Sequence, residues 1–585
     1  MQIEAAADVL AHENLAEPEL NVLLPNEDNY TVLLIQPRGQ IESTDTGVHH
    51  RDPSLARRQF GKFLEDAKST QADLVITPEY SLPWATLIEA ITKKDTTPTK
   101  GKLWVLGCES IKYCELDAVR NELAPFAATL YEKLDGDSTR FTDPLAYVFL
   151  APPASGHGNG LKPVVLVQFK TCAMGGDARH FETNGLQRGS LVYQFGTEQK
   201  LRLISLICSD ALAFEDQHAK GIYRQSLIIH IQLNRNPRHP DFRRYRDHLF
   251  SYEGDATEVI CLNWARDVEE WKPDGKEDWR NIGGSAWYLR PDRFGSCDQT
   301  LQSNHRLGLY YTWLKDSRAH ALFFNYQPAV YKLIASKVAH IGVLAVKSYR
   351  RGPQLILNSA WCEDHSAWVA QTTVDDGFPA VVGESGNANE ELKRIAADNP
   401  LQVERILALC SGQIASGDEW YEVDRLDSCV IDSCEVIRRL TFCQDTDAAA
   451  TGFLHRRLRL CGILWNILMN PANLPPALKD LKDGFHYQWS LGSPHQNVLS
   501  VSGQRATAVY VGEDSGSAQL EKTKKNFRER LRRSFADADD RAAALDRLAI
   551  WYRNSEGAIA LVDFRPHCAF DKMTDVSEYD IAREK

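Results

Sequence analysis

Several common sequence signals are absent from this 585-residue chain. It contains no run of about eighteen apolar residues, which a membrane-spanning helix requires. Its acidic amino terminus lacks the basic, apolar and small-residue segments of an export signal. Thirteen cysteines are present, but no Cys-x-x-Cys pair occurs, and Cys429 and Cys434 lack the second pair of a zinc site. The odd number of scattered cysteines favours reduced thiols in a cytoplasm.

The composition is that of an ordinary globular protein, with 43% apolar and 25% charged residues. A net charge of -12 argues against a protein whose main role is to coat nucleic acid. The chain is too long for a single ordinary core, so we expect at least two domains. No internal repeat is apparent in the sequence.

The pattern along the chain predicts four segments. Residues 1–28 are rich in Glu, Asp and Asn and are interpreted as a loose leader. Apolar strands alternate with helical stretches over residues 29–345, which predicts an α/β domain. Turn signals concentrate in residues 346–385, which we interpret as a linker region. Residues 386–585 are predicted to form a mainly helical α+β domain, with a strand at 507–511 and helices near 520–535 and 537–553.

Three short apolar runs of the α/β domain end on reactive side chains. They are Leu74–Glu79, Val164–Lys170 and Leu203–Cys208. Short runs rich in β-branched residues are typical of buried strands. In open α/β folds the reacting groups collect at the carboxyl ends of such strands. A carboxylate, an ammonium and a thiol brought together in this way could serve as base, electrostatic clamp and nucleophile.

Each of these residues also has an ordinary interpretation. Glu79 could cap a helix, Lys170 could end a strand in solvent, and Cys208 could fill a core. Taken singly, each of these is the usual role of such a residue. The ordered set of three, together with the motifs around them, is much more specific.

This ordered set resembles the carbon–nitrogen hydrolase (nitrilase) superfamily over about residues 30–340. The motifs that carry the resemblance are Pro78-Glu79, Lys170, Cys208-Ser209-Asp210, Phe214-Glu215, Gly189, Asn263 and Gly284-Ser285. The resemblance implies a four-layer α-β-β-α sandwich. It also implies a hydrolase that cleaves a non-peptide C–N bond, in an amide in preference to a nitrile, without metal or cofactor.

The resemblance assigns a role to each matching residue. Glu79 is expected to take the thiol proton, and Lys170 to stabilise the oxyanion with the backbone N–H that follows Cys208. Cys208 is expected to attack the C–N carbon and to form a thioester-type intermediate. Glu182 is our candidate for the second glutamate that orients the lysine in this superfamily. We expect Trp84, Ser209 and Asp210 in the substrate pocket.

Two departures from the family pattern concern the pocket mouth. The chain has Leu212-Ala213-Phe214-Glu215 where the family has Arg-Phe-Pro-Glu, and residues 171–177 are also unusual. The substrate is therefore less certain than the mechanism. A Cys–His mechanism would need His180, His230 or His239 to meet Cys208, and spacing selects none of them.

Other classes of function stay open from the sequence. By resemblance we expect a homo-oligomer formed through the sandwich face, with a small-molecule amide as substrate. The lack of a long apolar run leads us to expect no membrane partner, and the net charge disfavours nucleic acid as a partner. The large C-terminal domain exceeds what a small-molecule amidase requires, and a protein could bind there. An effector or sensor of bacterial anti-phage defence, active or catalytically silent, is the alternative function, and a pure scaffold is a third. No Tyr-x-Asp-Asp polymerase motif is present.

Overall fold

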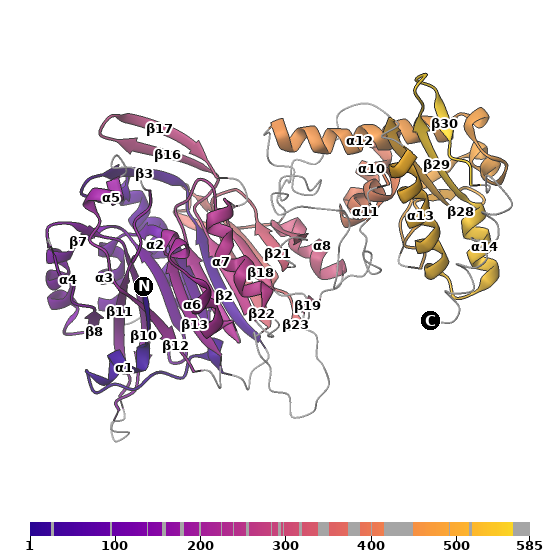
Figure 1. The fold of residues 1–585 in the computed structure, drawn as a ribbon. Helices are drawn as coiled ribbons and strands as arrows, with labels where there is room; N and C mark the ends of the chain where they lie inside the picture. The colour runs from indigo at the N-terminus through magenta and orange to yellow at the C-terminus, as the bar shows by residue number, and fades with distance from the viewer. Residues whose placement is uncertain are drawn as a thin grey trace. The chain divides into compact units, whose positions relative to one another are not determined.

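The chain forms two compact units in a computed structural model (Figure 1). The structure describes residues 1–24, 29–93, 96–136, 138–154, 160–175, 181–197, 201–223, 225–237, 239–252, 257–281, 284–289, 294–295, 298–314, 319–336, 350–372, 387–398, 400–412, 414, 448–490, 492–513 and 517–564. One unit comprises residues 1–381 with 422–451, and the other comprises 382–421 with 452–585. Cys429 and Cys434 lie outside the described residues, as do parts of the predicted linker region, so the predicted domain limits stay a prediction.

Two large sheets form the centre of the first unit. The nine-stranded sheet has the spatial order β25 (Ala367–Gln371), β24 (Gln354–Cys362), β22 (Ala329–Ser336), β2 (Asn29–Gln36), β5 (Leu74–Leu82), β6 (Leu103–Cys108), β10 (Pro144–Ala151), β11 (Lys162–Phe169), β8 (Ala128–Tyr131). The eight-stranded sheet has the order β1 (Gln2–Ala5), β12 (Leu191–Phe195), β13 (Arg202–Ile207), β14 (Ser226–Ile231), β15 (Thr257–Leu262), β18 (Ala286–Leu289), β21 (Ala319–Phe324), β20 (Leu309–Leu314).

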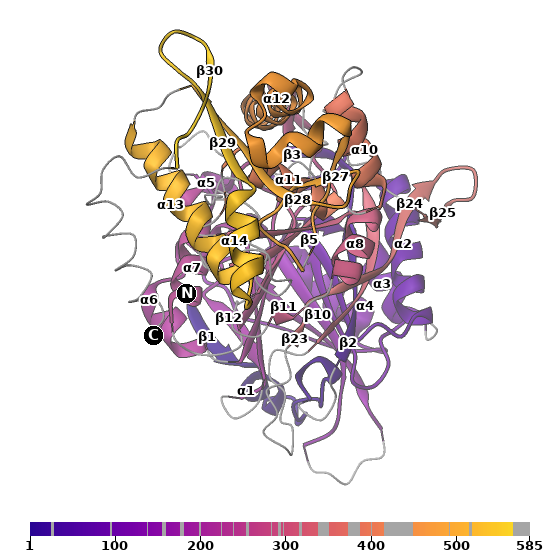
Figure 2. The same cartoon turned by 90° about the vertical axis from the view of Figure 1, so that its right-hand side faces the viewer.

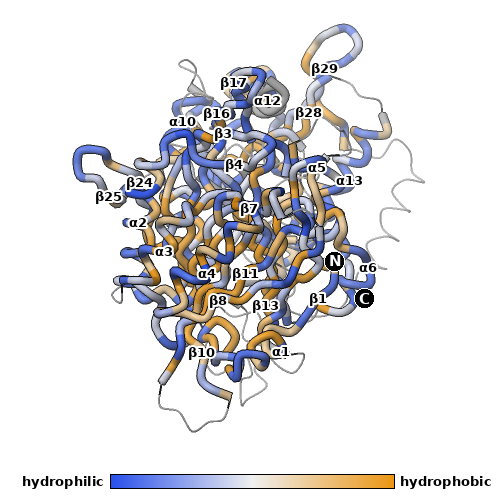
Figure 3. Tube along the Cα trace, turned by 90° about the vertical axis from the view of Figure 1, so that its left-hand side faces the viewer, coloured by the Kyte–Doolittle hydropathy of each residue, from blue (hydrophilic) through white to orange (hydrophobic). Residues whose placement is uncertain are grey.

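The central strands are apolar on both faces because both faces are covered. Every residue of β5, β6, β13, β14 and β15 is buried. Strands β5 and β6 pair in parallel, as do β13, β14 and β15. Parallel strands of this kind occur where layers cover the sheet on each side. In Figure 3 the hydrophobic colour gathers on strands such as β10, β11 and β13 in the interior of this unit, whereas the turn between β24 and β25 is hydrophilic.

Helices cover the outer face of each sheet. Helices α2 (Pro53–Ser69), α3 (Trp84–Thr92) and α4 (Leu116–Leu123) share a core with the nine-stranded sheet. Helices α6 (Asp216–Ile222) and α7 (Pro240–Ser251) share a core with the eight-stranded sheet. Helix α2 begins at a favourable site, since the Asp52 carboxylate accepts from the N–H groups of Ser54 and Leu55. Because β14 and β15 contact β5, the layers follow the order helix, sheet, sheet, helix, and the predicted α-β-β-α fold class is confirmed (Figure 2).

Two segments of the first unit differ from the sequence prediction. The predicted leader is not loose: β1 pairs in parallel with β12, and Ala6 and Leu10 are buried in helix α1 (Ala6–Ala11). The predicted linker region contains β24 and β25, which extend the nine-stranded sheet beyond β22. Strand β1 lies at the edge of its sheet and β24 and β25 lie at the end of theirs, so these strands are only partly buried and lack the fully apolar pattern of the central strands.

A smaller four-stranded sheet adjoins these layers. Its order is β17 (Gly275–Arg280), β16 (Asp267–Lys272), β3 (Gly39–Thr44), β4 (Gly47–His50). Strands β16 and β17 form an antiparallel hairpin, and β16 pairs in parallel with β3. This sheet brings a polar hairpin toward the ends of the central strands, where it lines the cavity described below.

The second unit combines helices with a five-stranded sheet. Its sheet has the order β26 (Phe485–Tyr487), β27 (Val498–Ser500), β28 (Arg505–Glu513), β29 (Leu548–Arg553), β30 (Ile559–Leu561). Its helices include α10 (Asn387–Asp398), α11 (Pro400–Cys410), α12 (Ala448–Met469), α13 (Ser517–Ser534) and α14 (Ala538–Asp546).

One helix predicted in this unit is too long. We predicted a helix over 537–553, but α14 ends at Asp546 and residues 548–553 form β29, parallel to β28. The β-branched and aromatic residues Ile550, Trp551 and Tyr552 favour the strand. Across both units, no helix of the described residues is long and apolar enough to cross a membrane.

Candidate active site

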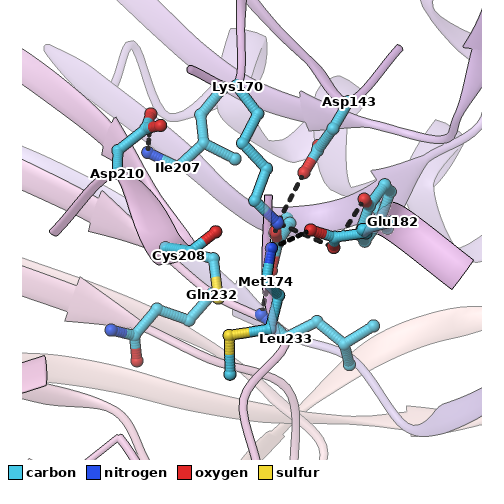
Figure 4. A network of polar contacts seen from close by, with 12 residues as sticks. Asp143, Lys170, Met174, Glu182, Ile207, Cys208, Asp210, Gln232 and Leu233 are labelled. Atoms are coloured by element: carbon cyan, nitrogen blue, oxygen red, sulfur yellow. Dashed lines mark hydrogen bonds and ion pairs between the residues drawn. The ribbon is translucent and has the colours of Figure 1, made fainter. Parts of the chain in front are cut away.

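One buried ammonium group joins three acidic side chains from distant parts of the chain. Lys170 Nζ lies 2.7 Å from Glu79 Oε1 and 2.8 Å from Glu182 Oε1. A third carboxylate oxygen, Asp143 Oδ2, lies 3.3 Å from the same nitrogen. All four side chains are almost completely buried. Figure 4 shows the Lys170 side chain pointing toward Asp143 and Glu182. We call Glu79, Asp143, Lys170 and Glu182 the floor cluster.

The strand that carries Glu79 bends sharply at this residue. Tyr80, the next residue, has φ +57°, and the register between β5 and β6 shifts between Thr77 and Leu82. Gly107 of β6 permits the bend, because a Cβ atom there would meet the Pro78 carbonyl oxygen at 2.1 Å. The indole N–H of Trp264 donates to the Glu79 carbonyl at 2.8 Å. The backbone conformation at Glu79 and Tyr80 therefore fixes the direction of the Glu79 side chain.

Lys170 is fixed on both sides of its backbone. It follows β11, its N–H donates to the Asp143 carbonyl at 3.0 Å, and its own carbonyl accepts from Gly189 at 2.9 Å. The ammonium lies 5.6 Å from the ring centre of Tyr80. Burial alone would lower the pKa of Lys170, but Glu182 and Glu79 together with Asp143 raise it well above its ordinary value. This side chain stays positively charged.

The two glutamates are held as acceptors. Glu79 Oε2 accepts from the Leu233 N–H. Glu182, in α5 (Phe181–Gly185), accepts from the Tyr80 hydroxyl at 3.0 Å and from the Met174 N–H at 2.7 Å. Burial raises the pKa of Glu79, while the charge of Lys170 opposes this shift. A carboxylate withdrawn from water in this way suits a general base.

Cys208 lies at a strained exit from β13. It has φ +40° and begins the 3₁₀ turn Cys208–Leu212. Burial and the negative charge of Glu79 raise the pKa of the Cys208 thiol well above its ordinary value, although Lys170 opposes this. The thiol therefore holds its proton at rest, so a nucleophilic role requires a base nearby.

The carbonyl of Cys208 is held by a buried histidine. His230 Nε2 lies 2.9 Å from the Cys208 carbonyl oxygen, and His230 Nδ1 lies 2.7 Å from the Tyr245 hydroxyl. Burial lowers the pKa of His230 to about 3, so the ring is neutral. In this state Nε2–H donates to the carbonyl and Nδ1 accepts from Tyr245. His230 thus contacts the backbone of Cys208.

The other two histidines considered for a Cys–His pair give it no support. His239 lines the cavity, but its ring caps α7 by accepting from the Asp241 N–H at 3.3 Å. His180 lies outside the described residues. The described contacts of His230 and His239 are therefore with groups other than the Cys208 thiol.

A cavity of about 1190 Å³ opens in front of the floor cluster. Tyr80, Glu182 and Cys208 line its inner end, with Ala173, Met174, Phe181, Leu212 and Leu233. Residues of the β16–β17 hairpin and of the segment after β14 also line it. Among these, Arg235 Nη1 pairs with Glu277 at 2.5 Å, and the Arg235 guanidinium lies 5.2 Å from the Trp279 ring centre. We call Arg235, Lys272, Glu277 and Trp279 the rim cluster.

The three residues that we expected in the substrate pocket do not line this cavity. Asp210 is fully buried: one oxygen accepts from the Thr171 and Cys172 N–H groups, and the other from the Ile207 N–H. The Ser209 hydroxyl donates to the Cys172 carbonyl. Both residues therefore tie the Cys208 turn to the segment after Lys170, and the pocket prediction is wrong for them.

Trp84 was also misplaced by the sequence prediction. It begins α3, packs in the core between helices and the nine-stranded sheet, and donates its indole N–H to the Glu109 carbonyl at 2.9 Å. The amphipathic pattern of α3 turns this ring toward the sheet. Its role in the described structure is structural.

The acidic side chains of the floor cluster also have the spacing of a metal site. One oxygen from each of Glu79, Asp143 and Glu182 lies within 4.8 Å of the others. The Lys170 ammonium contacts all three, however, and a metal ion would have to displace it. These oxygens therefore already surround a cation that the chain supplies.

Sequence reasoning missed Asp143. The residue precedes β10, which pairs antiparallel with β11 so that Pro144 lies opposite Phe169. This register places the residue before β10 beside the residue after β11, which is Lys170. The signal was available as an acidic residue before an apolar run, but it required the pairing of these two strands to be known.

No family model and no curated protein sequence matches the chain. Among solved structures, it is similar to a glutamine-dependent NAD⁺ synthetase from Acinetobacter baumannii, with 11% identity, a TM-score of 0.30, and 75% of this chain and 73% of that chain covered. It is also similar to a mutant amidase of the nitrilase superfamily from Nesterenkonia AN1, with 11% identity, a TM-score of 0.29, and coverage of 54% and 93%. It is similar as well to a CN-hydrolase superfamily protein from Xanthomonas campestris, with 12% identity, a TM-score of 0.28, and 52% of this chain and 90% of that chain covered. Values of this size assign neither a family nor an activity.

Proposed function

We propose that this chain hydrolyses a non-peptide C–N bond, in an amide in preference to a nitrile, with Cys208 as the nucleophile. One observation carries the proposal. A buried lysine ammonium contacts two buried glutamates behind a cavity that the nucleophile candidate lines. These are the residues that the resemblance to carbon–nitrogen hydrolases selects in the sequence.

The first chemical step requires a proton to leave the thiol. Glu79 accepts this proton as Cys208 Sγ forms a bond to the carbonyl carbon, and the π electrons of the carbonyl move to its oxygen. Lys170 and the backbone N–H of Ser209 stabilise the oxyanion. Glu182 holds the Lys170 ammonium in place from its other side.

The second half of the reaction releases the acyl group. Glu79 passes its proton to the leaving nitrogen as the C–N bond breaks, which leaves a thioester on Cys208. A water molecule then gives a proton to Glu79 and its oxygen attacks the thioester carbon. The products are a carboxylic acid and an amine or ammonia, and the thiol recovers its proton.

The cavity favours a substrate larger than a simple aliphatic amide. Its volume of about 1190 Å³ lies above the usual range of small-molecule sites. Phe181, Leu212 and Leu233 offer apolar contact near Cys208, and Trp279 offers an aromatic surface at the rim. We therefore propose an amide with a sizeable apolar or aromatic group.

Intact-mass spectrometry tests this proposal directly. The protein is incubated with a panel of amides and nitriles, followed by peptide mapping for an adduct. We expect an acyl or thioimidate adduct on Cys208 that is absent in Cys208→Ala. Cys172→Ala is the matched control, because Cys172 lies beside the site without lining the cavity, and it should retain the adduct. No adduct across the panel, or an adduct on Cys172 alone, would contradict the proposal.

The expectations about biological context are proposals as well. They are a cytoplasmic location, a homo-oligomer formed through the sandwich face, and the alternative role in anti-phage defence. The last can be tested in cells that express the chain, because Cys208→Ala should abolish protection against phage if hydrolysis drives defence. Protection that survives Cys208→Ala would favour a non-catalytic role.

A further inference from the structure

Asp143 is the one member of the floor cluster that the proposed reaction does not use. It is fully buried beside the start of β10, and its backbone carbonyl accepts from the Lys170 N–H. Its Oδ2 lies 3.3 Å from Lys170 Nζ, which is longer than the contacts of Glu79 and Glu182 with the same nitrogen. A buried carboxyl group so close to two others needs a physical explanation.

The three carboxyl groups differ in the hydrogen bonds they receive. Glu79 accepts from Lys170 and from the Leu233 N–H. Glu182 accepts from Lys170, from the Tyr80 hydroxyl and from the Met174 N–H. Among the described residues, neither oxygen of Asp143 accepts a hydrogen bond. Hydrogen bonds thus stabilise two of the groups as anions, whereas Asp143 has only its 3.3 Å ion pair with Lys170.

Charge balance gives the same result. Three anionic carboxylates around one ammonium would leave two uncompensated negative charges on side chains that are almost completely buried. A single proton on one carboxyl group removes one of them. The group without hydrogen-bond donors is the one that gains most from binding this proton. Burial and the negative charge of Glu79 also raise the pKa of Asp143 well above its ordinary value.

We propose that Asp143 is a positioning residue that carries a proton at neutral pH and donates it as a hydrogen bond to the Glu79 carboxylate. The proposal rests on the proposed function, in which Glu79 is the base for Cys208. The Asp143 proton stays on Asp143 throughout. Its hydrogen bond stabilises the anionic form of Glu79. The titratable groups around it are Glu79, Lys170, Glu182, Tyr80, Cys108 and Cys208.

The pH profile of Cys208 alkylation separates this role from a merely structural one. The full chain is treated with iodoacetamide, and the modified Cys208 peptide is quantified by mass spectrometry at each pH. Asp143→Ala removes the donor, so the pKa of Glu79 rises and the acid limb of the profile moves to higher pH by about one unit. Asp143→Asn keeps a neutral hydrogen-bond donor of the same shape. In this variant the rate of Cys208 alkylation should therefore rise over the same acidic pH range as in the wild type.

Asp210→Asn is the matched control for protein stability. Asp210 is also a fully buried carboxylate near the site, but its oxygens accept from three backbone N–H groups, which an amide nitrogen cannot do. We expect thermal unfolding at neutral pH to shift down strongly in Asp210→Asn and only slightly in Asp143→Asn. Equal losses in the two variants would show that Asp143 is ionised and overturn the proposal.

Infrared spectroscopy of protein with labelled aspartate gives a readout that needs no substrate. The wild type should show a protonated carboxyl band at neutral pH that disappears in Asp143→Asn, even if Asp143→Ala fails to fold. Absence of this band, or an acid limb that is unchanged in Asp143→Ala, overturns the proposal. If the band is present and no amide is cleaved, the proposed function fails while the protonation of Asp143 stands.

Discussion

The floor cluster and the rim cluster contain ion pairs of similar length in very different surroundings. At the floor, Lys170 and Glu79 approach to 2.7 Å with side chains that are 0% and 1% exposed. At the rim, Arg235 and Glu277 approach to 2.5 Å with side chains that are 46% and 41% exposed. A list of distances would treat the two as equal. Solvent makes them different in stability and in chemistry.

The difference follows from desolvation. A buried charge that loses its partner is left without water, so breaking a floor pair is expensive. A rim charge that loses its partner is solvated at once, and salt screens the pair even when it is intact. Residues whose pKa values are strongly shifted by burial are therefore expected in the floor cluster and not in the rim cluster. The rim is suited to contact with the outer part of a substrate.

Lys170→Met should have the largest effect of the variants that test this comparison. It leaves Glu79, Asp143 and Glu182 without their shared cation, so we expect a loss of about 3–5 kcal/mol in the free energy of unfolding and no acyl adduct on Cys208. Urea unfolding and intact-mass spectrometry measure the two effects. Lys272→Met in the rim cluster is the control. Equal losses of unfolding free energy in the two variants would show that the floor and rim ion pairs do not differ in stability.

Glu182→Gln should have an intermediate effect. The glutamine keeps an oxygen for the Met174 N–H but loses the charge that holds the Lys170 ammonium. We expect the rate of adduct formation to fall about 10- to 100-fold, as for the loss of one charge-assisted hydrogen bond. Glu270→Gln, another carboxylate that lines the cavity, should change the rate far less. An unchanged rate in Glu182→Gln would remove Glu182 from the mechanism.

The buried, neutral ring of His230 should make the free energy of unfolding depend on pH. Its pKa is about 3 in the folded chain and 6.5 in the unfolded chain, so the unfolded state binds the proton more readily. The stability present above pH 6.5 is therefore lost as the pH falls from 6.5 toward 3. His230→Gln should lose less stability than wild type between pH 7 and pH 4 in urea unfolding. Parallel losses in the two proteins would show that His230 is not buried as a neutral ring.

Arg235→Gln at the rim should have the smallest effect. The free energy of unfolding should change by no more than about 1 kcal/mol, and the difference from wild type should shrink in high salt. Glu277 has a pKa of about 2 next to Arg235 and Lys272, so any stability from this pair is present above pH 4.5 and is lost as the pH falls through 2. A large, salt-independent loss would place the rim pair in the same class as the floor.

The sequence allowed the residues at strand ends to be predicted. The runs before Glu79, Lys170 and Cys208 are apolar except for one polar residue in each, because these parts of their strands are buried on both faces. Glu182 was placed correctly beside Lys170 although its loop has no such pattern. The Lys170→Met and Glu182→Gln variants test the catalytic roles of these residues.

Other features could not be read from the sequence. The directions of the Ser209 and Asp210 side chains depend on a turn with a positive φ at Cys208, which sequence periodicity does not describe. The rim hairpin was missed because β16 and β17 are polar on much of both faces and give no alternating pattern. Asp143 required the pairing of two strands. Each of these depends on tertiary structure.

The pairing of β1 with β12 has a consequence for biosynthesis. Gln2 lies beside Leu191 in the finished sheet, so residues 2–5 leave the ribosome well before the strand with which they pair. At typical elongation rates this delay is roughly ten to forty seconds. During that time the segment cannot form its native edge, and a chaperone that shields it would be expected to raise the yield of the nascent chain.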